Sequence, residues 1–235
     1  MISIVSEDLG KESCENLLKI TDKIVFIRRY TRLYPAIMSH ADIQCFPIDG
    51  QCLVVHPSLD KATLEELDYY KVKIQFGQKS LSLSYPNNIH YNCAKVGNKF
   101  IHHREYTDDI VIKEGLKRGI EFIHTKQGYS KCSTLIVDDN SIITADRGIA
   151  KAAKSHGIDA LFITPGHIIL PGFKEGFIGG AGGVLLQQNE VIFNGNIRLH
   201  PDFQRIHNFI MEKGMKYQCL SSGPLIDIGS IFFIA

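Results

Sequence analysis

The sequence lacks several features that would assign it to a class of protein at once. Lysine and arginine (26) nearly balance aspartate and glutamate (25), so the formal net charge is only +1. This balance argues against a nucleic-acid partner or an anionic membrane surface. No apolar run approaches the roughly 20 residues that span a bilayer. The opening segment, MISIVSEDLGKES, lacks the basic and apolar stretches of a secretory signal, so we expect neither a signal nor a membrane partner.

The common cofactor and metal motifs are missing as well. The sequence has no Walker loop, no dinucleotide fingerprint after a strand and no His-Glu-x-x-His helix. Its six cysteines are scattered, and none forms a Cys-x-x-Cys pair. A chain of this length can build its own core without a disulfide framework. We therefore predict a cytoplasmic protein with free thiols, no cofactor and no metal.

What the sequence does contain is a repeated order of elements: two short strands around a turn, then a helix, then another strand. The hairpins are expected over residues 42–56, 90–103, 132–145 and 181–194. Their turns are predicted at Asp49-Gly50, Gly97-Asn98, Asp139-Asn140 and Gln188-Asn189. Asp-Gly and Gly-Asn pairs supply the positive φ angles that tight hairpins require.

A helix with recognisable end signals follows each hairpin. The residues expected at the helix starts are Ser58 or Asp60, Thr107, Asp146 and Pro201. Glycines at 119, 157 and 214 are expected to end the last three helices. Strands are then predicted over residues 72–76, 120–125, 158–163 and 216–220.

The two ends of the chain complete the pattern. Residues 2–5 and 226–234 are predicted strands, and a helix around Leu17 and a strand over residues 23–27 follow the first of them. Joined, these segments make a fifth unit shared between the termini, which would leave no open sheet edge. The sequence thus predicts an α/β fold in which residues 1–235 form one domain: a closed five-module ββαβ propeller with pseudo-five-fold symmetry.

This arrangement resembles the pentein fold, which includes the arginine and agmatine deiminases, dimethylarginine hydrolases and amidinotransferases, as well as a non-catalytic ribosome-binding translation factor. The resemblance covers the whole chain and depends on module architecture. It also extends to small uncharacterised bacterial proteins of that fold. It implies a substrate pocket on the axis of the ring.

The register of the hairpins predicts which residues face that axis. Counting back seven residues from the first turn residue gives Asp42, His90 and Cys132 in the first three modules. Because strand side chains alternate, equal offsets place these residues on equivalent faces. The fifth module has no visible turn, and its counterpart is expected at Asp227.

A carboxylate, an imidazole and a thiol together suit Cys-dependent chemistry on a guanidine. In this hypothesis Cys132 is the nucleophile and His90 the acid–base residue, while Asp42 and Asp227 bind the planar cation. His40, two residues from Asp42 on the same expected strand face, is a second candidate for the base. Lys126 follows a predicted inter-module strand, where a ring fold carries pocket loops, so it is a further candidate for substrate binding.

The sequence also departs from the catalytic members of the family. Those enzymes carry their cysteine in the last module and their histidine in a Gly-His-x-Asp-like segment. Here residues 224–230 contain no cysteine and residues 179–183 no histidine.

Three hypotheses follow from this departure. The first is a Cys-dependent hydrolase or transferase for a small guanidine or amidine, with its site moved around the ring. The second is a catalytically silent pentein that binds a metabolite or a macromolecule. The third is an interaction protein, supported only by Arg28, Arg29 and Arg32 between tyrosines, which a solvated connection also explains. The sequence does not predict an oligomeric state.

Overall fold

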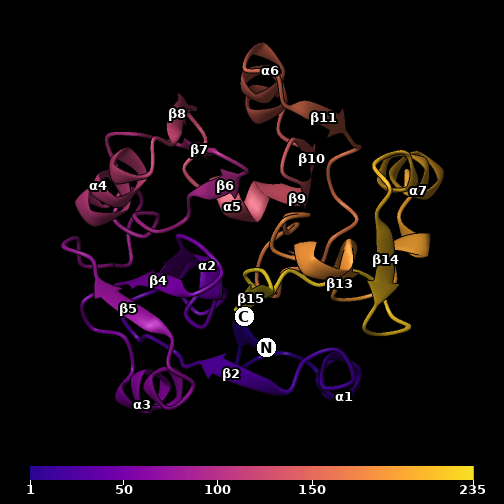
Figure 1. Ribbon diagram of the computed structural model, residues 1–235. Helices are drawn as coiled ribbons and strands as arrows, with labels where there is room; N and C mark the ends of the chain where they lie inside the picture. The colour runs from indigo at the N-terminus through magenta and orange to yellow at the C-terminus, as the bar shows by residue number, and fades with distance from the viewer. Residues whose placement is uncertain (235) are drawn as a thin grey trace.

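The computed structural model describes residues 1–234, which form a mixed α/β fold with five three-stranded sheets. In each sheet the middle strand pairs antiparallel with one neighbour and parallel with the other. Figure 1 shows the sheets arranged around a common centre, with the longer helices on the outside. We call each sheet with its outer helix a module.

The strands of the five sheets are short. In sheet order they are β15 (Phe232–Ile234), β1 (Ile2–Ser6) and β2 (Lys23–Ile27); β3 (Cys45–Pro47), β4 (Cys52–Val55) and β5 (Lys73–Phe76); β6 (Ala94–Val96), β7 (Lys99–His102) and β8 (Glu121–His124); β9 (Thr134–Asp138), β10 (Ser141–Thr144) and β11 (Asp159–Phe162); and β12 (Gly182–Leu185), β13 (Glu190–Phe193) and β14 (Lys216–Cys219).

One outer helix connects the middle strand of each sheet to its parallel partner. These helices are α1 (Lys11–Leu17), α3 (Lys61–Tyr69), α4 (Asp109–Lys117), α6 (Arg147–Ser155) and α7 (Phe203–Glu212). Two single-turn helices, α2 (Ala41–Gln44) and α5 (Ser130–Ser133), directly precede β3 and β9. Two 3₁₀ turns lie at η1 (Leu186–Gln188) and η2 (Ile197–Leu199).

The core lies between each sheet and its helix. Helix α7 buries Ile206 and Ile210 against Val191 and Phe193 of β13, and α6 buries Ile149 and other residues against its own sheet. Burial of each such side chain contributes about 1.5–3 kcal/mol. The period of 3.6 on the helices and of two on the strands therefore fixes which faces meet.

The local signals predicted most elements correctly. Asp60 caps α3 through the N–H of Thr63, and Asp146 caps α6. The expectation for Thr107 is wrong, because Asp108 caps α4. The Thr107 hydroxyl is already engaged, since it lies 2.7 Å from Nδ1 of His102.

Three expectations about the strands are also wrong. The predicted strand over 226–234 shrinks to β15, because Gly229 and Ser230 have φ angles of 70° and 73° that no extended strand tolerates. Asp42 and Cys132 lie in α2 and α5, not at strand starts, so alternation of strand faces does not place them. The turn at Gln188-Asn189 is longer than two residues, because η1 precedes it.

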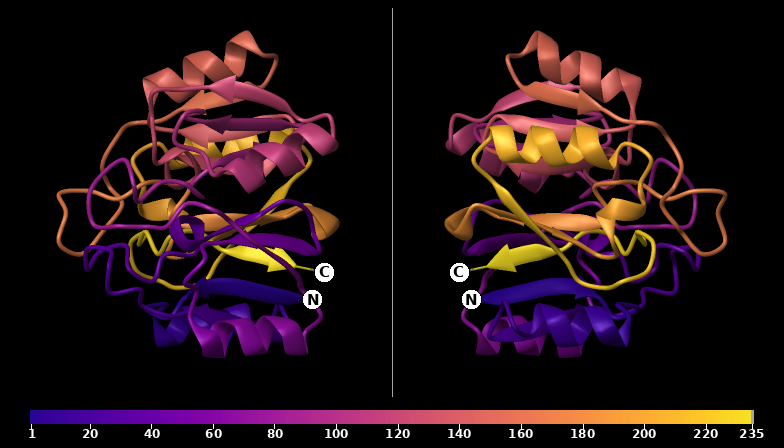
Figure 2. Two further views of the ribbon diagram at one scale, coloured as in Figure 1. Left: turned by 90° about the vertical axis from the view of Figure 1, so that its left-hand side faces the viewer. Right: turned by 90° about the vertical axis from the view of Figure 1, so that its right-hand side faces the viewer.

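The two ends of the chain lie side by side. Strand β1 pairs antiparallel with β15 and parallel with β2, so one sheet contains both ends of the described chain. Figure 2 shows the loop around residues 165–178 projecting from the end of the molecule opposite the termini.

Within residues 1–234, no helix has the length and apolar character needed to cross a membrane.

Candidate active site

Five polar side chains from four modules meet at the centre of the molecule, although none of them is more than 6% exposed. We call this set the hub cluster: Asp42, Asn92, Lys131, Cys132 and Ser230. Each residue lies just before the first strand of its sheet, where the chain enters the centre. Buried polar groups must satisfy one another, so these contacts define a single network.

Cys132 and Asp42 form the chemical core of the hub cluster. The Cys132 sulfur lies 3.2 Å from each Asp42 carboxylate oxygen, so the thiol donates its hydrogen to this carboxylate. Burial raises the pKa of Cys132 well above its usual value, and the charges of Asp42 and Asp227 raise it further. Burial likewise raises the pKa of Asp42. The resting state is therefore a thiol rather than a thiolate.

Asn92 fixes the orientation of this pair. Its side-chain oxygen accepts hydrogen bonds from the N–H groups of Lys131 and Cys132, which turns its amide nitrogen toward the sulfur. That nitrogen donates to the Cys132 sulfur at 3.1 Å and to the backbone oxygen of Asp42 at 2.9 Å. A donor at the sulfur stabilises a thiolate whenever one forms.

Lys131 and Ser230 extend the network along the centre. Nζ of Lys131 donates to the Ser230 hydroxyl oxygen at 2.8 Å and to the Gly179 carbonyl at 3.1 Å. The Ser230 hydroxyl in turn lies 2.5 Å from an oxygen of Asp42. Burial lowers the pKa of Lys131, while the negative charge of Asp42 raises it.

His40 and Asp227 lie beside the hub cluster. A ring nitrogen of His40, a carboxylate oxygen of Asp42 and the Cys132 sulfur all lie within 4.8 Å of one another. Nδ1 of His40 is buried 3.9 Å from Asp227 and has no hydrogen-bond partner among residues 1–234. Burial lowers the pKa of His40, which favours the neutral imidazole.

Asp227 is held by the backbone around it. Its carboxylate accepts hydrogen bonds from the N–H groups of Phe177 (2.9 Å) and Gly229 (3.0 Å). Burial raises the pKa of Asp227 to about 6, although these two donors oppose the shift. The Asp227 carboxylate packs directly against the backbone of Gly180. Only glycine fits there, because a Cβ at this position would lie 1.9 Å from Oδ1 of Asp227.

Aromatic side chains from the loops cover this centre. The Tyr34 and Tyr129 hydroxyls lie 2.9 Å apart, and the rings of Phe173 and Phe177 pack against Tyr34 and Tyr129 respectively. Burial raises the pKa of Tyr34, with further contributions from Cys132 and Asp227 that reflect their closeness. We call Tyr34, Tyr129, Phe173 and Phe177 the aromatic cover.

Two of the residues selected from the sequence lie elsewhere. Nδ1 of His90 lies 2.6 Å from the carbonyl of Tyr106, and the charged groups that act on this ring are Lys79, Asp108 and Asp109 rather than Cys132. Lys126 is exposed and lines a separate surface cavity with Asp146. His90 therefore does not join Cys132 and Asp42 as the register predicted.

The reason is the length of the first strand. Strand β6 has three residues and β9 has five, so counting back from the turn overshoots by two residues in the second module. Counted from the strand starts instead, Asn92, Cys132 and Ser230 all lie two residues before β6, β9 and β15. Sequence reasoning missed Asn92, Lys131 and Ser230, and only the strand starts could have revealed Asn92 and Ser230.

His40, Asp42 and Cys132 could also hold a metal ion. Each offers one ligand atom, and the imidazole nitrogen, the carboxylate oxygen and the sulfur lie within 4.8 Å of one another. Such donors suit Zn²⁺. The same three groups equally form a nucleophile with a base and a carboxylate.

Several solved structures have a similar architecture. A dimethylarginine dimethylaminohydrolase from Pseudomonas aeruginosa, complexed with citrulline, matches with a TM-score of 0.54 and 11% identity over 93% of this chain and 91% of that one. Another dimethylarginine dimethylaminohydrolase, an adduct with S-methyl-L-thiocitrulline, matches with a TM-score of 0.53 and 13% identity over the same shares of both chains. An agmatine deiminase from C. jejuni with substrate bound matches with a TM-score of 0.50 and 11% identity, over 92% of this chain and 78% of that chain.

These likenesses show that the chain has the pentein fold of guanidine-modifying enzymes, which the sequence predicted. Within that fold, the chain belongs to a family described as of unknown function (DUF6873), whose model matches residues 4–232. A search of curated proteins found no match.

Proposed function

We propose that the five modules form one closed propeller and a single domain, with the fifth module completed by both ends of the chain. Support comes from hydrogen bonds that join each module to the next at the centre. In order they run from Asn92 Nδ2 to Asp42 O, from Lys131 N to Asn92 O, from Gly180 N to Cys132 O, from Ser230 N to Gly180 O and from Asp42 N to Gly229 O. The last bond returns to the first module, and the β1–β15 pairing supports the same closure.

At the centre of this ring we propose a Cys-dependent hydrolase or transferase that acts on a small guanidine or amidine. The single observation that carries the proposal is the contact of the Cys132 sulfur with both oxygens of Asp42, with a ring nitrogen of His40 within 4.8 Å. A buried thiol, imidazole and carboxylate in one place are costly to maintain for packing alone.

In the proposed reaction the planar cation binds to the carboxylates of Asp42 and Asp227 by charge-assisted hydrogen bonds. His40 takes the thiol proton, and the Cys132 sulfur forms a bond to the central carbon of the guanidine. The C–N bond to the leaving amine breaks, and His40 gives its proton to that amine. Water, or an acceptor amine in a transferase, then attacks the carbon and restores the thiol.

The bound cation itself activates the nucleophile. Without it, burial and two carboxylates hold the pKa of Cys132 high. A guanidinium between Asp42 and Asp227 offsets their negative charge, so the thiolate becomes accessible when substrate is present. Substrate reaches the thiol only after the aromatic cover moves, because Cys132 is 2% exposed.

The test compares two cysteine variants on a panel of guanidines and amidines. Cys132→Ala should lower turnover at least about 1000-fold, as loss of a catalytic nucleophile does. Cys93→Ala is the matched control, since Cys93 is also buried in the same hydrophobic cluster, and it should retain activity. Release of ammonia or amine and a mass adduct on Cys132 are the measurements. Equal activity of the two variants would remove the proposed nucleophile.

A catalytically silent binding protein is the second candidate, and one observation favours it. Lys131 already places a cation next to Asp42 through Ser230, so the carboxylate has an internal partner without any substrate. This candidate predicts that the wild-type protein turns over no member of the panel and forms no adduct.

A further inference from the structure

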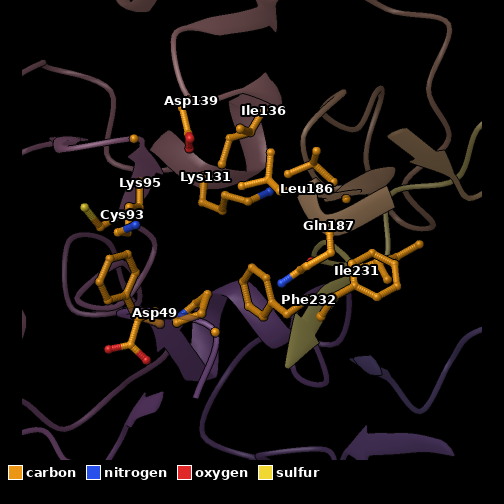
Figure 3. A pocket seen from close by; sticks show the side chains of 17 residues that line it. Asp49, Cys93, Lys95, Lys131, Ile136, Asp139, Leu186, Gln187, Ile231 and Phe232 are labelled. Carbon is orange, nitrogen blue, oxygen red and sulfur yellow. The ribbon is translucent and has the colours of Figure 1, made fainter. Parts of the chain in front are cut away.

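A cavity of about 180 Å³ lies on the axis of the molecule, among the hairpin turns rather than under the aromatic cover. Its mouth is formed by residues of three turns and of η1, and Lys131 lies in its wall. Figure 3 shows the side chain of Lys131, a residue of α5, reaching into this space. We call it the axial cavity. Side chains that line it include Phe46, Lys95, Lys131, Ile136, Val184 and Phe232.

Lys131 gives the axial cavity a buried hydrogen-bond donor. The residue is 6% exposed, and its Nζ contacts two acceptors within residues 1–234, the carbonyl of Gly179 and the hydroxyl of Ser230. An ammonium has three N–H groups, so one remains for a ligand. Because Ser230 also contacts Asp42, this cation and the Cys132 thiol belong to one hydrogen-bonded chain.

Two cations and two carboxylates line the axial cavity, and the two carboxylates are offset by their surroundings. Lys95 adds a second cation to the wall. The carboxylate of Asp49 is engaged, because it accepts hydrogen bonds from Arg118 and from the backbone N–H groups of Gln51 and Cys52. Asp139 is exposed in its turn, where water screens its charge.

Most of the remaining wall is apolar, with Gln187 as a polar exception. Phe46 and Phe232 are buried, and Ile136 and Val184 are half-buried. Gly183 brings β12 close to the last module, because a Cβ there would lie 2.0 Å from the carbonyl of Ile231. Pockets of this kind bind a ligand by its apolar body and orient it by a few polar groups.

We propose that the axial cavity binds a small monocarboxylate with an apolar body, whose carboxylate accepts hydrogen bonds from Lys131 at the inner end. The volume exceeds the roughly 150 Å³ of an engineered cavity that binds benzene, so it suits a compound of the size of benzoate. This site differs from the proposed guanidine site in both charge and position: it takes an anion, and it opens among the hairpin turns.

Calorimetric titration with three probes of one shape tests the charge preference. Benzoate should bind, benzamide should bind at least tenfold more weakly, and benzylammonium should not bind. Equal affinity for benzoate and benzamide would overturn the proposal. So would the absence of benzoate binding up to about 10 mM, because a dissociation constant of that size corresponds to a binding free energy of only about 3 kcal/mol.

Variants locate the site and separate it from the proposed catalysis. Val184→Trp fills the axial cavity from β12 while every hub-cluster residue keeps its identity, and it should abolish benzoate binding, whereas Gln188→Trp in the exposed turn should not. Lys131→Met should lower affinity at least tenfold where that variant folds. Cys132→Ala should bind benzoate as the wild type does, so failure of the guanidine reaction leaves this result unchanged. Unaltered binding in Val184→Trp would place the ligand elsewhere.

Discussion

Asp227 has a carboxylate that folding removes from water and places between two backbone N–H donors. Its ordinary pKa of 3.8 applies to the unfolded chain, and burial raises the folded value to about 6. The folded protein therefore binds this proton more tightly than the unfolded chain does. The resulting stabilisation is complete below about pH 4 and is lost as the pH rises through about 6.

The first prediction follows from this linkage. Asp227→Asn removes the titration, so the difference in unfolding free energy between wild type and variant should fall by about 2 kcal/mol between pH 4 and pH 7. Urea unfolding at pH 4, 5, 6 and 7 measures the difference. Asp139→Asn, an exposed carboxylate change, controls for the loss of charge. A difference that stays constant or grows with pH would contradict the prediction.

At the same scale, single residues show what the sequence could predict about the site. Asp42 and Cys132 stand out as polar residues ahead of apolar strands, and the structure brings them into contact. Asn92 has the same place before β6, but counting back from the turn selected His90 instead. Its role depends on contacts with a residue 40 positions away, which no local pattern encodes. Ser230 contacts Asp42 across 188 positions and was missed for the same reason.

Among the elements, helix ends could be predicted and strand lengths could not. A cap acts within three residues, so Asp60 and Asp146 identify their helices from sequence alone. A strand's length is set by its pairing partners, and β6 and β9 differ by two residues under similar sequence patterns. The single-turn helices α2 and α5 are too short to show a helical period.

The N-cap residue of α4 does more than begin the helix. The buried Asp108 carboxylate accepts from the N–H of Ile110 within α4 and also from the N–H groups of Gln78 and Lys79. The Tyr91 hydroxyl donates to it as well. This carboxylate therefore joins α4 to the segment that leads to Asn92.

We predict that Asp108→Ala lowers the free energy of unfolding by about 3–5 kcal/mol, because several buried N–H donors lose a charged acceptor. Asp60→Ala is the matched control: Asp60 caps α3 through Thr63 alone and should cost about 1 kcal/mol. Urea unfolding of both variants gives the comparison. Similar losses in the two would mean that Asp108 acts only as a helix cap.

For the whole molecule, the proposed closed ring predicts how cooperatively the protein unfolds. If every module depends on two neighbours through the centre, loosening one sheet weakens the others. An open array would instead lose its terminal sheet first, since each unit would contact only its chain neighbours. The sheet that contains both chain ends is the place to distinguish these cases, because β15 is held there by β1.

The last prediction therefore concerns Ile234, which is 2% exposed and pairs with Ile2 across that sheet. Ile234→Ala should lower the free energy of unfolding by about 2–4 kcal/mol. The loss should shift circular dichroism and the labelling of the Cys93 thiol, which is buried beside β6, to the same new urea midpoint. Leu199→Ala, an exposed change, should move neither. If only the circular dichroism shifted while Cys93 kept its wild-type midpoint, the sheet of β15, β1 and β2 would unfold alone. The ring would then not be closed.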